Sequence, residues 1–210
     1  MGQILKDHVK TQIVESAIKD IFENGMLGSS MRKIASNANM TVGNLYRYFK
    51  NKDELIDFII SPVLNRISKV IQKYTNIIID LNDDHIDLTH ISIEDITHIL
   101  DDLSIELVDI YTETPKPFMI LMMNDKVNEN ILKWFAKIIM EFMISKKYVN
   151  ENNKARCELL SRAYAISLFA GVKDLLANNK LDRNELSMVI KMYFRSCISF
   201  IDKNFEGLEV

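Results

Sequence analysis

Residues 29–54 read SSMRKIASNANMTVGNLYRYFKNKDE, and this stretch decides the fold. Ser29 or Ser30 can cap a short helix, because a serine oxygen accepts hydrogen bonds from the amides that a first helical turn leaves unsatisfied. Asn39 tolerates the left-handed conformation in which helices often end, and Thr41 can cap a second short helix. Two short helices joined by a tight turn predict a helix-turn-helix.

The second predicted helix has an inward and an outward face. Leu45 and Phe49 are spaced one helical turn apart, so both point toward a core. Gly43 lies on the other side, where it costs about 1 kcal/mol of helix stability relative to alanine but lets the backbone come close to a partner. Arg47 on the same side can bind a base edge or a phosphate. The outward face is therefore suited to a DNA groove.

The charge pattern of this region agrees with DNA binding. Between residues 24 and 52 the chain has five basic residues and no acidic one, although the whole chain has a formal net charge of -3. The basic residues are Arg32, Lys33, Arg47, Lys50 and Lys52. A basic segment inside an acidic chain is the electrostatic pattern expected for a surface that binds a polyanion.

The same stretch resembles the TetR/AcrR family of bacterial transcriptional regulators. The matching residues are Ser29 to Arg32, Ile34 and Ala35, and the run TVGNLYRYFKNKDEL from Thr41 to Leu55. In the family, Gly-x-Leu-Tyr-x-Tyr-Phe followed by Lys-[Asp/Glu]-[Asp/Glu]-Leu is a specific signature. The chain departs from the family at Asn39, where glycine is common, and at Val42, where a polar or basic residue is frequent. The second departure bears on which bases are preferred.

The resemblance and the outward face together give a set of candidate DNA-binding residues. The candidates for base recognition are Arg32, Val42, Asn44 and Arg47. The candidates for positioning on phosphates are Ser29, Thr41, Tyr46, Tyr48 and Lys52, and Gly43 would allow close approach of the backbone. The resemblance implies the phosphate contact of Lys52, since the corresponding lysine makes that contact in the family.

The composition favours long helices over sheets. The chain has 210 residues, of which 48% are hydrophobic, but only 6 glycines and 3 prolines, so it can bury a core and has few turn residues. We therefore predict an all-α fold, with a three-helix helix-turn-helix headpiece in residues 1–51 and a helical ligand-binding and dimerisation domain in residues 52–210. Pro62 predicts a kink or a restart in the helix that begins near Lys52.

Neither a membrane span nor a signal peptide is expected. No apolar run approaches the roughly 18 residues that a membrane-spanning helix needs, and no signal peptide precedes the first predicted helix. A cytoplasmic protein is therefore expected. Cys157 and Cys197 show no zinc spacing and are interpreted as core residues, with a redox-sensing thiol as the alternative.

The segment from residue 74 to residue 115 has eleven acidic residues and neither lysine nor arginine. A solvated acidic face is the favoured interpretation of this pattern. Three alternatives remain open: a site for a cationic ligand, a metal site that uses His85, His90 and His98, or a face that keeps this part of the protein away from DNA. We predict no bound metal.

Methionine and aromatic residues mark a candidate ligand pocket in the second half of the chain. Methionine adapts to varied apolar ligands but also fills ordinary cores, so both interpretations stay open. The candidate pocket residues are Tyr111, Met119, Met122, Met123, Trp134, Met140 and Tyr164.

The last two predicted helices, residues 154–178 and 183–203, carry small and apolar side chains at helical spacing. In the TetR/AcrR family the last two helices pair with those of a second subunit, and a helix pair buried within one subunit is the alternative. The candidate dimer residues are Ala163, Ser167, Ala170, Gly171, Tyr193, Phe194 and Cys197.

These features predict a homodimeric regulator that binds double-stranded DNA by sequence. The expected activity is repression at a palindromic operator that is relieved by a small, partly apolar effector. The alternative is a helical bundle of the same fold that acts through protein contacts, or through metal or ligand binding, without specific DNA binding. No catalytic or phosphate-binding motif is present, so neither an enzyme nor a cofactor is expected.

Overall fold

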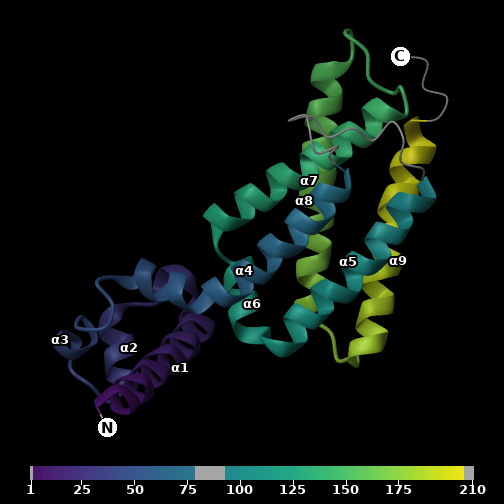
Figure 1. The fold of residues 1–210 in the computed structure, drawn as a ribbon. Coiled ribbons are helices and arrows are strands. Elements are labelled where there is room, and N and C mark those ends of the chain that lie inside the picture. Colours follow the sequence, from purple (N-terminus) through teal and green to yellow (C-terminus); the bar gives the residue numbers. More distant parts are fainter. Residues whose placement is uncertain (1, 79–92, 206–210) are drawn as a thin grey trace. The chain divides into compact units, whose positions relative to one another are not determined.

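The computed structural model describes residues 2–78 and 93–205, and all regular secondary structure in these two ranges is helical (Figure 1). The prediction of an all-α fold is confirmed. Among the described helices, none combines the length and the apolar content of a membrane span. The helices are α1 (Gly2–Gly28), α2 (Met31–Asn37), α3 (Val42–Leu45), α4 (Lys52–Ile78), α5 (Ile93–Glu113), α6 (Pro115–Met122), α7 (Asp125–Ser145), α8 (Lys154–Ala177) and α9 (Arg183–Phe205).

The chain forms two compact units. The first consists of Met1–Asn65 and Thr114–Met123, and the second consists of Arg66–Glu113 and Asn124–Val210. The first half of α4 belongs to the first unit, where Phe58 stacks edge-on against Phe49 at a centroid distance of 5.4 Å. The division therefore falls within α4, whereas the predicted domain boundary at residue 51 precedes this helix.

The first unit buries one face of each helix around α1. Ile13, Ala17 and Ile21 on α1 are at most 1% exposed, and α1 packs against both α2 and α6. Gly25 interrupts the regular conformation of α1 with a φ of 73°, which a glycine adopts without steric cost. α1 therefore supplies the surface on which the short helices α2 and α6 rest.

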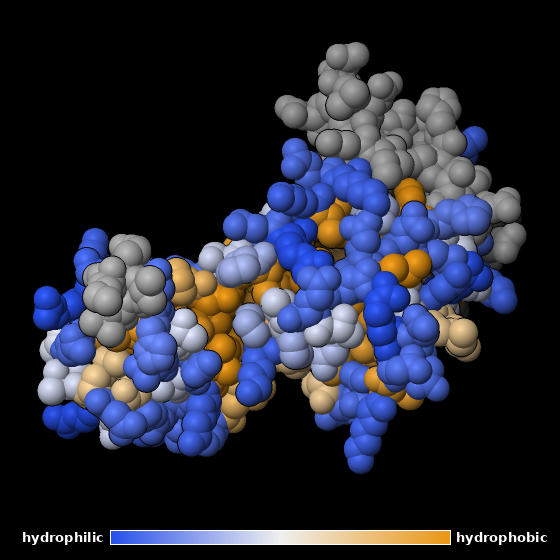
Figure 2. Space-filling view, turned by 60° about the horizontal axis from the view of Figure 1, so that its bottom comes forward, coloured by the Kyte–Doolittle hydropathy of each residue, from blue (hydrophilic) through white to orange (hydrophobic). Residues whose placement is uncertain are grey.

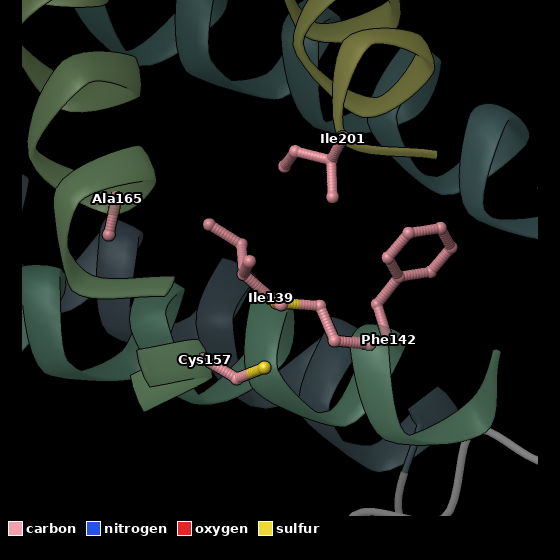
Figure 3. Close-up of a cluster of buried hydrophobic side chains, with 6 residues drawn as sticks. Ile139, Phe142, Cys157, Ala165 and Ile201 are labelled. Carbon is pink, nitrogen blue, oxygen red and sulfur yellow. The ribbon is translucent and has the colours of Figure 1, made fainter. Parts of the chain in front are cut away.

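The second unit is a bundle in which α7 packs against α8 and α5 packs against α9 (Figure 1). Figure 3 shows part of its core, where Ile139 and Phe142 of α7 lie near Cys157 of α8 and Ile201 of α9. Burial raises the pKa of the Cys157 thiol, and burial also raises that of Cys197. Raised pKa values disfavour reactive thiolates, in agreement with core roles for both cysteines.

Four acidic residues of α5 pair with basic residues of the same unit. Asp101 accepts a hydrogen bond from the Arg195 guanidinium at 2.8 Å and also pairs with Lys191 at 2.7 Å. The hydrogen bond from Arg195 lowers the pKa of Asp101. Three further pairs join α5 to neighbouring helices: Asp109 with Arg183, Glu106 with Lys73, and Glu113 with Arg66.

These ion pairs favour a structural interpretation of the acidic segment over a cation site, as far as the described residues show. Such pairs are partly exposed, so each adds little to stability, but together they fix which faces of α4, α5 and α9 meet. On the face drawn in Figure 2, hydrophilic residues cover most of the surface and apolar areas are interspersed among them. His85 and His90 of the alternative metal site lie outside the described residues.

Of the kink or restart expected at Pro62, the restart is wrong, because α4 runs as one helix from Lys52 to Ile78; the kink stays a prediction. Proline removes one backbone donor. The flanking residues Ile60 and Val63 are at most 1% exposed, so core packing on both sides holds the helix together through the proline.

Candidate nucleic-acid interface and ligand cavity

Side-chain caps define both short helices of the helix-turn-helix. The Ser30 side chain accepts a hydrogen bond from the Lys33 amide at 3.3 Å, and the Thr41 side chain accepts one from the Asn44 amide at 3.2 Å. Asn39 between them has a φ of 53°, in the left-handed region. The predicted capping by Ser30 and Thr41 and the predicted turn at Asn39 are confirmed.

Residues 42–49, which we call the recognition segment, are held in place by buried side chains on their inner side. α3 itself has only 4 residues, but its backbone hydrogen bonds continue as far as Phe49, whose amide donates to the Leu45 carbonyl at 3.2 Å. Leu45 is 0% exposed and Phe49 is 3% exposed. These two side chains fix the orientation of the segment, as the spacing predicted.

Most of the candidate DNA-binding residues lie on the surface of this segment. Arg32, Thr41, Gly43, Tyr46 and Arg47 are exposed, and Val42, Asn44 and Tyr48 are half-buried. In Figure 1, α3 lies at the edge of the first unit beside α2. Apart from its chain neighbours and the backbone of its own helix, no atom lies within 4 Å of the position that a Cβ would take at Gly43. The exposed face of α3 is therefore open to a large partner.

Two of the candidate phosphate contacts are engaged inside the protein instead. Ser29 is 4% exposed, and its hydroxyl donates to the Asp20 carboxylate at 2.6 Å. The Lys52 ammonium donates to the carbonyls of Met26 and Ser29, at 2.7 and 3.1 Å. These bonds hold both side chains against the link between α1 and α2.

Asp20 is a functional candidate that the sequence interpretation missed. It is 1% exposed, and its carboxylate accepts hydrogen bonds from Asn24, from the Ser29 hydroxyl and from the Ser30 amide. Its position in the sequence could have indicated a buried carboxylate, since Asp20 lies between Ala17 and Ile21 on the apolar stripe of α1. A carboxylate on a buried stripe needs hydrogen-bond donors.

The second unit contains an apolar cavity of about 60 Å³. Its lining comes from α4, α5, α7, α8 and α9, and among the described lining residues the only hydroxyl belongs to Tyr74. That hydroxyl donates to Glu106 at 3.0 Å, and burial raises the pKa of Tyr74 to about 12. The lining residues are Tyr74, Ile99, Leu100, Leu103, Trp134, Phe135, Ile138, Ile139, Phe142, Leu168 and Ile198.

The structure separates the predicted pocket residues. Trp134 lines the apolar cavity, and Tyr164 lines a more open cavity of about 390 Å³ between α8 and α9. The Tyr111 hydroxyl donates to the Leu176 carbonyl at 2.8 Å. Met140 packs against the core of the second unit. The remaining three, Met119, Met122 and Met123, belong to the first unit. The aliphatic lining residues were missed because their pattern is that of any buried helix.

The candidate dimer residues fall into three groups. Ala163, Ser167 and Ala170 are exposed on α8. Phe194 is 1% exposed, so it belongs to the core of the second unit. The remaining candidates line contacts between α8 and α9, where the Tyr193 hydroxyl donates to the Ser167 carbonyl at 2.8 Å. A Cβ at Gly171 would lie 2.1 Å from that hydroxyl, so this glycine makes room for Tyr193.

Large apolar side chains that the sequence interpretation did not select are exposed on the same two helices. Leu159 and Ile166 on α8 are 71% and 46% exposed. Met188, Met192 and Phe200 on α9 are 63%, 62% and 57% exposed. We call these five residues the exposed apolar face. Exposed large apolar side chains are common where a protein binds another protein.

A short helix-turn-helix with a basic exposed face defines the class of helix-turn-helix DNA-binding proteins. Residues 13–58 match the model of the family described as bacterial regulatory proteins, tetR family. The helix-turn-helix segment of the chain lies within this match.

Relatives and solved structures agree with that assignment. HTH-type transcriptional regulator PksA of Bacillus subtilis (strain 168) is 39% identical over 64 residues, which are 30% of this chain and 31% of that protein. Fatty acid metabolism regulator protein of the same strain is 42% identical over 45 residues, which are 21% of this chain and 23% of that protein. The chain thus matches about a third or less of the length of these curated relatives.

The likeness in fold extends over most of the chain. A TetR-like transcriptional regulator from Rhodococcus sp. RHA1 has a TM-score of 0.56 at 16% identity, covering 90% of this chain and 96% of that one. NalD, the secondary repressor of the MexAB-OprM multidrug efflux pump in Pseudomonas aeruginosa, has a TM-score of 0.51 at 18% identity, with coverage of 90% and 96%. The fold of the chain is therefore that of TetR-like regulators.

The open surface at Gly43 allows folding and DNA binding to be separated. We expect Gly43→Ala to leave the free energy of unfolding unchanged or to raise it by up to about 1 kcal/mol, because alanine favours helix and the added methyl meets no atom of the protein. The same methyl should weaken DNA binding. Urea unfolding and a DNA titration of the same variant measure the two effects. Unchanged DNA affinity would remove Gly43 from the interface.

Proposed function

We propose that the protein is a cytoplasmic, non-catalytic transcriptional regulator that binds a palindromic operator as a homodimer and is released by a small-molecule effector. The observation that carries this proposal is the recognition segment itself. Buried Leu45 and Phe49 hold it in place, and exposed Arg47 and Gly43 lie on its outer side. The alternative is a bundle that acts through protein contacts or through metal or ligand binding. Such a protein would not require an exposed arginine and glycine on the outer side of this segment.

Base recognition is assigned to the outer side of α3 and to the start of α2. Arg47 and Asn44 have the donors that read purine edges in the major groove, and Val42 can contact a thymine methyl group. Arg32 is exposed at the start of α2. Thr41, Tyr46 and Tyr48 have hydroxyls that can donate to phosphates and so set the register on the duplex.

The exposed apolar face supports dimerisation through α8 and α9. Leaving Leu159, Met188 and Met192 more than half exposed in one subunit costs hydrophobic free energy that a partner surface would recover. A two-fold axis brings the same patch of each subunit together. Two recognition segments on the half-sites of a palindrome double the sequence information that a single short segment can read.

The apolar cavity of the second unit supports an effector with a hydrocarbon group. The Tyr74 hydroxyl already donates to Glu106, so the walls offer contacts to carbon and few to polar atoms. An effector that binds one conformation of the dimer more tightly would shift the population toward it and change DNA affinity by that difference.

The specific role of Arg47 can be tested with a duplex that the wild-type protein selects from a random pool. Arg47→Ala should lower affinity for that duplex by about 10- to 100-fold more than affinity for random DNA, because a lost base contact costs about 1–3 kcal/mol only where the base is correct. Fluorescence anisotropy measures both affinities. Lys137→Ala, an exposed lysine of α7, is the control and should bind as wild type. Equal losses on both DNAs would exclude Arg47 from base recognition.

The proposed dimer face predicts the effect of a charge on α9. Met192→Glu should convert the dimer to a monomer, because an interface that buries this side chain would have to desolvate a carboxylate. Sedimentation velocity measures the mass in solution. Ile144→Glu, on a 44% exposed apolar residue of α7 outside the face, should remain a dimer. A dimeric Met192→Glu variant would contradict the proposed face.

A substitution that fills the apolar cavity tests whether the effector binds there. Compounds with alkyl or aryl groups that bind wild type should raise its melting temperature by mass action. Ile138→Trp, which places an indole at a lining position, should abolish that rise while DNA binding persists. The matched variant Ile105→Trp, on a 44% exposed residue of α5, should keep it. An equal rise in both variants would place the effector elsewhere.

A further inference from the structure

The C-terminal end of α1 and the two residues that lead to α2, together residues 24–30, are held by hydrogen bonds from their surroundings. We call these residues the connector. From α1, the Asp20 carboxylate accepts from the Asn24 side chain at 2.9 Å, from the Ser29 hydroxyl at 2.6 Å and from the Ser30 amide at 3.2 Å. All three donors lie in the connector. Asp20 therefore ties both of its ends to the buried side of α1.

Two lysines bind the carbonyl groups of the same connector. Lys52, the first residue of α4, donates to the carbonyls of Met26 and Ser29 at 2.7 and 3.1 Å. Lys33 of α2 donates to the Gly28 carbonyl at 3.1 Å. These carbonyls lie where α1 ends, and cationic side chains stabilise such carbonyls at a helix C-terminus.

Apolar packing contributes little to the connector. Leu27 is 99% exposed, and Gly25 and Gly28 have no side chain with which to pack. Ser29 is the one fully buried side chain of residues 24–30, and its hydroxyl and carbonyl bind Asp20 and Lys52 respectively. The path of the connector is therefore set by hydrogen bonds to these two charged residues, and it leads directly to Ser30, the cap of α2.

We propose that Asp20 and Lys52 are positioning residues for DNA binding, which act through Ser29 to set the placement of α2 and α3 relative to α1 and α4. In this role Lys52 holds the first residue of α4 to the start of the helix-turn-helix and is not primarily a phosphate contact. The inference rests on the proposed DNA-binding function.

The first test asks whether removal of the negative charge of Asp20 strengthens or weakens DNA binding. Asp20→Asn removes a negative charge from a DNA-binding unit, which by electrostatics alone would tighten binding to a polyanion. A positioning role predicts the reverse, an affinity for the selected duplex about tenfold lower, because asparagine cannot accept all three hydrogen bonds. Glu23→Gln, on an exposed acid of the same helix, is the matched control and should bind as tightly as wild type or more tightly. Tighter binding by Asp20→Asn would overturn the proposal.

The second test uses the salt dependence of binding to the same duplex. Lys52→Met should lower affinity about tenfold and leave the slope of log affinity against log salt unchanged. Lys50→Met, on an exposed lysine two residues earlier, is the comparison variant that also removes one positive charge from this region. A lost phosphate contact would reduce the slope by about 0.9. A reduced slope for Lys52→Met would make it a phosphate contact and overturn its positioning role.

A third readout does not depend on DNA. Amide hydrogen exchange of residues 29–34 should become faster in both Asp20→Asn and Lys52→Met and stay as in wild type in Glu23→Gln, with melting temperature measured for all three as a check of folding. If wild type selected no duplex, the proposed function would fail while the exchange rates still decided the connector's role. Unchanged exchange in both variants would overturn the inference by itself.

Discussion

The burial of Leu45 and Phe49 is the contact on which the DNA-binding surface depends. A helix of 4 residues has no independent stability in water, so α3 exists because its inner side chains are inserted into the first unit. Caps from Ser30 and Thr41 and the left-handed Asn39 set where each short helix begins and ends. The outward-facing residues do not contribute to the core, so they can serve DNA binding without loss of the fold. This separation explains how an exposed glycine and an exposed arginine coexist in the same short segment.

The second unit follows a different principle, in which long helices meet through matched faces. Apolar residues of α7 and α8 form one contact, and α5 and α9 add ion pairs such as Asp101 with Arg195 to theirs. The acidic character of α5 is thus complementary to the basic residues of its neighbours. The cavity lined by Trp134 and Ile138 lies where apolar side chains do not fill the space between these helices.

Sequence patterns predicted the features that local chemistry determines. The helical class, the caps at Ser30 and Thr41, and the inward pair on α3 all follow from residue type and spacing. Features that depend on tertiary contacts were not accessible. Nothing in the sequence distinguishes Asp20 from other acidic residues. Its carboxylate accepts hydrogen bonds from the connector only because the fold brings Ser29 against it. Pro62 is tolerated because its neighbours are buried, and the cavity is lined mainly by aliphatic residues that no motif distinguishes from core.

The central claim is that the first unit reads DNA sequence, and one titration tests it directly. Purified protein would be titrated against the intergenic DNA upstream of its own gene and against a scrambled duplex of equal length, each at two salt concentrations. The account predicts tighter binding to the intergenic DNA at both salts, with dimer stoichiometry and with affinity that falls as salt rises. Binding that is equally weak on both duplexes, for this DNA and for duplexes selected from a random pool, would contradict it and favour a protein that acts through protein contacts.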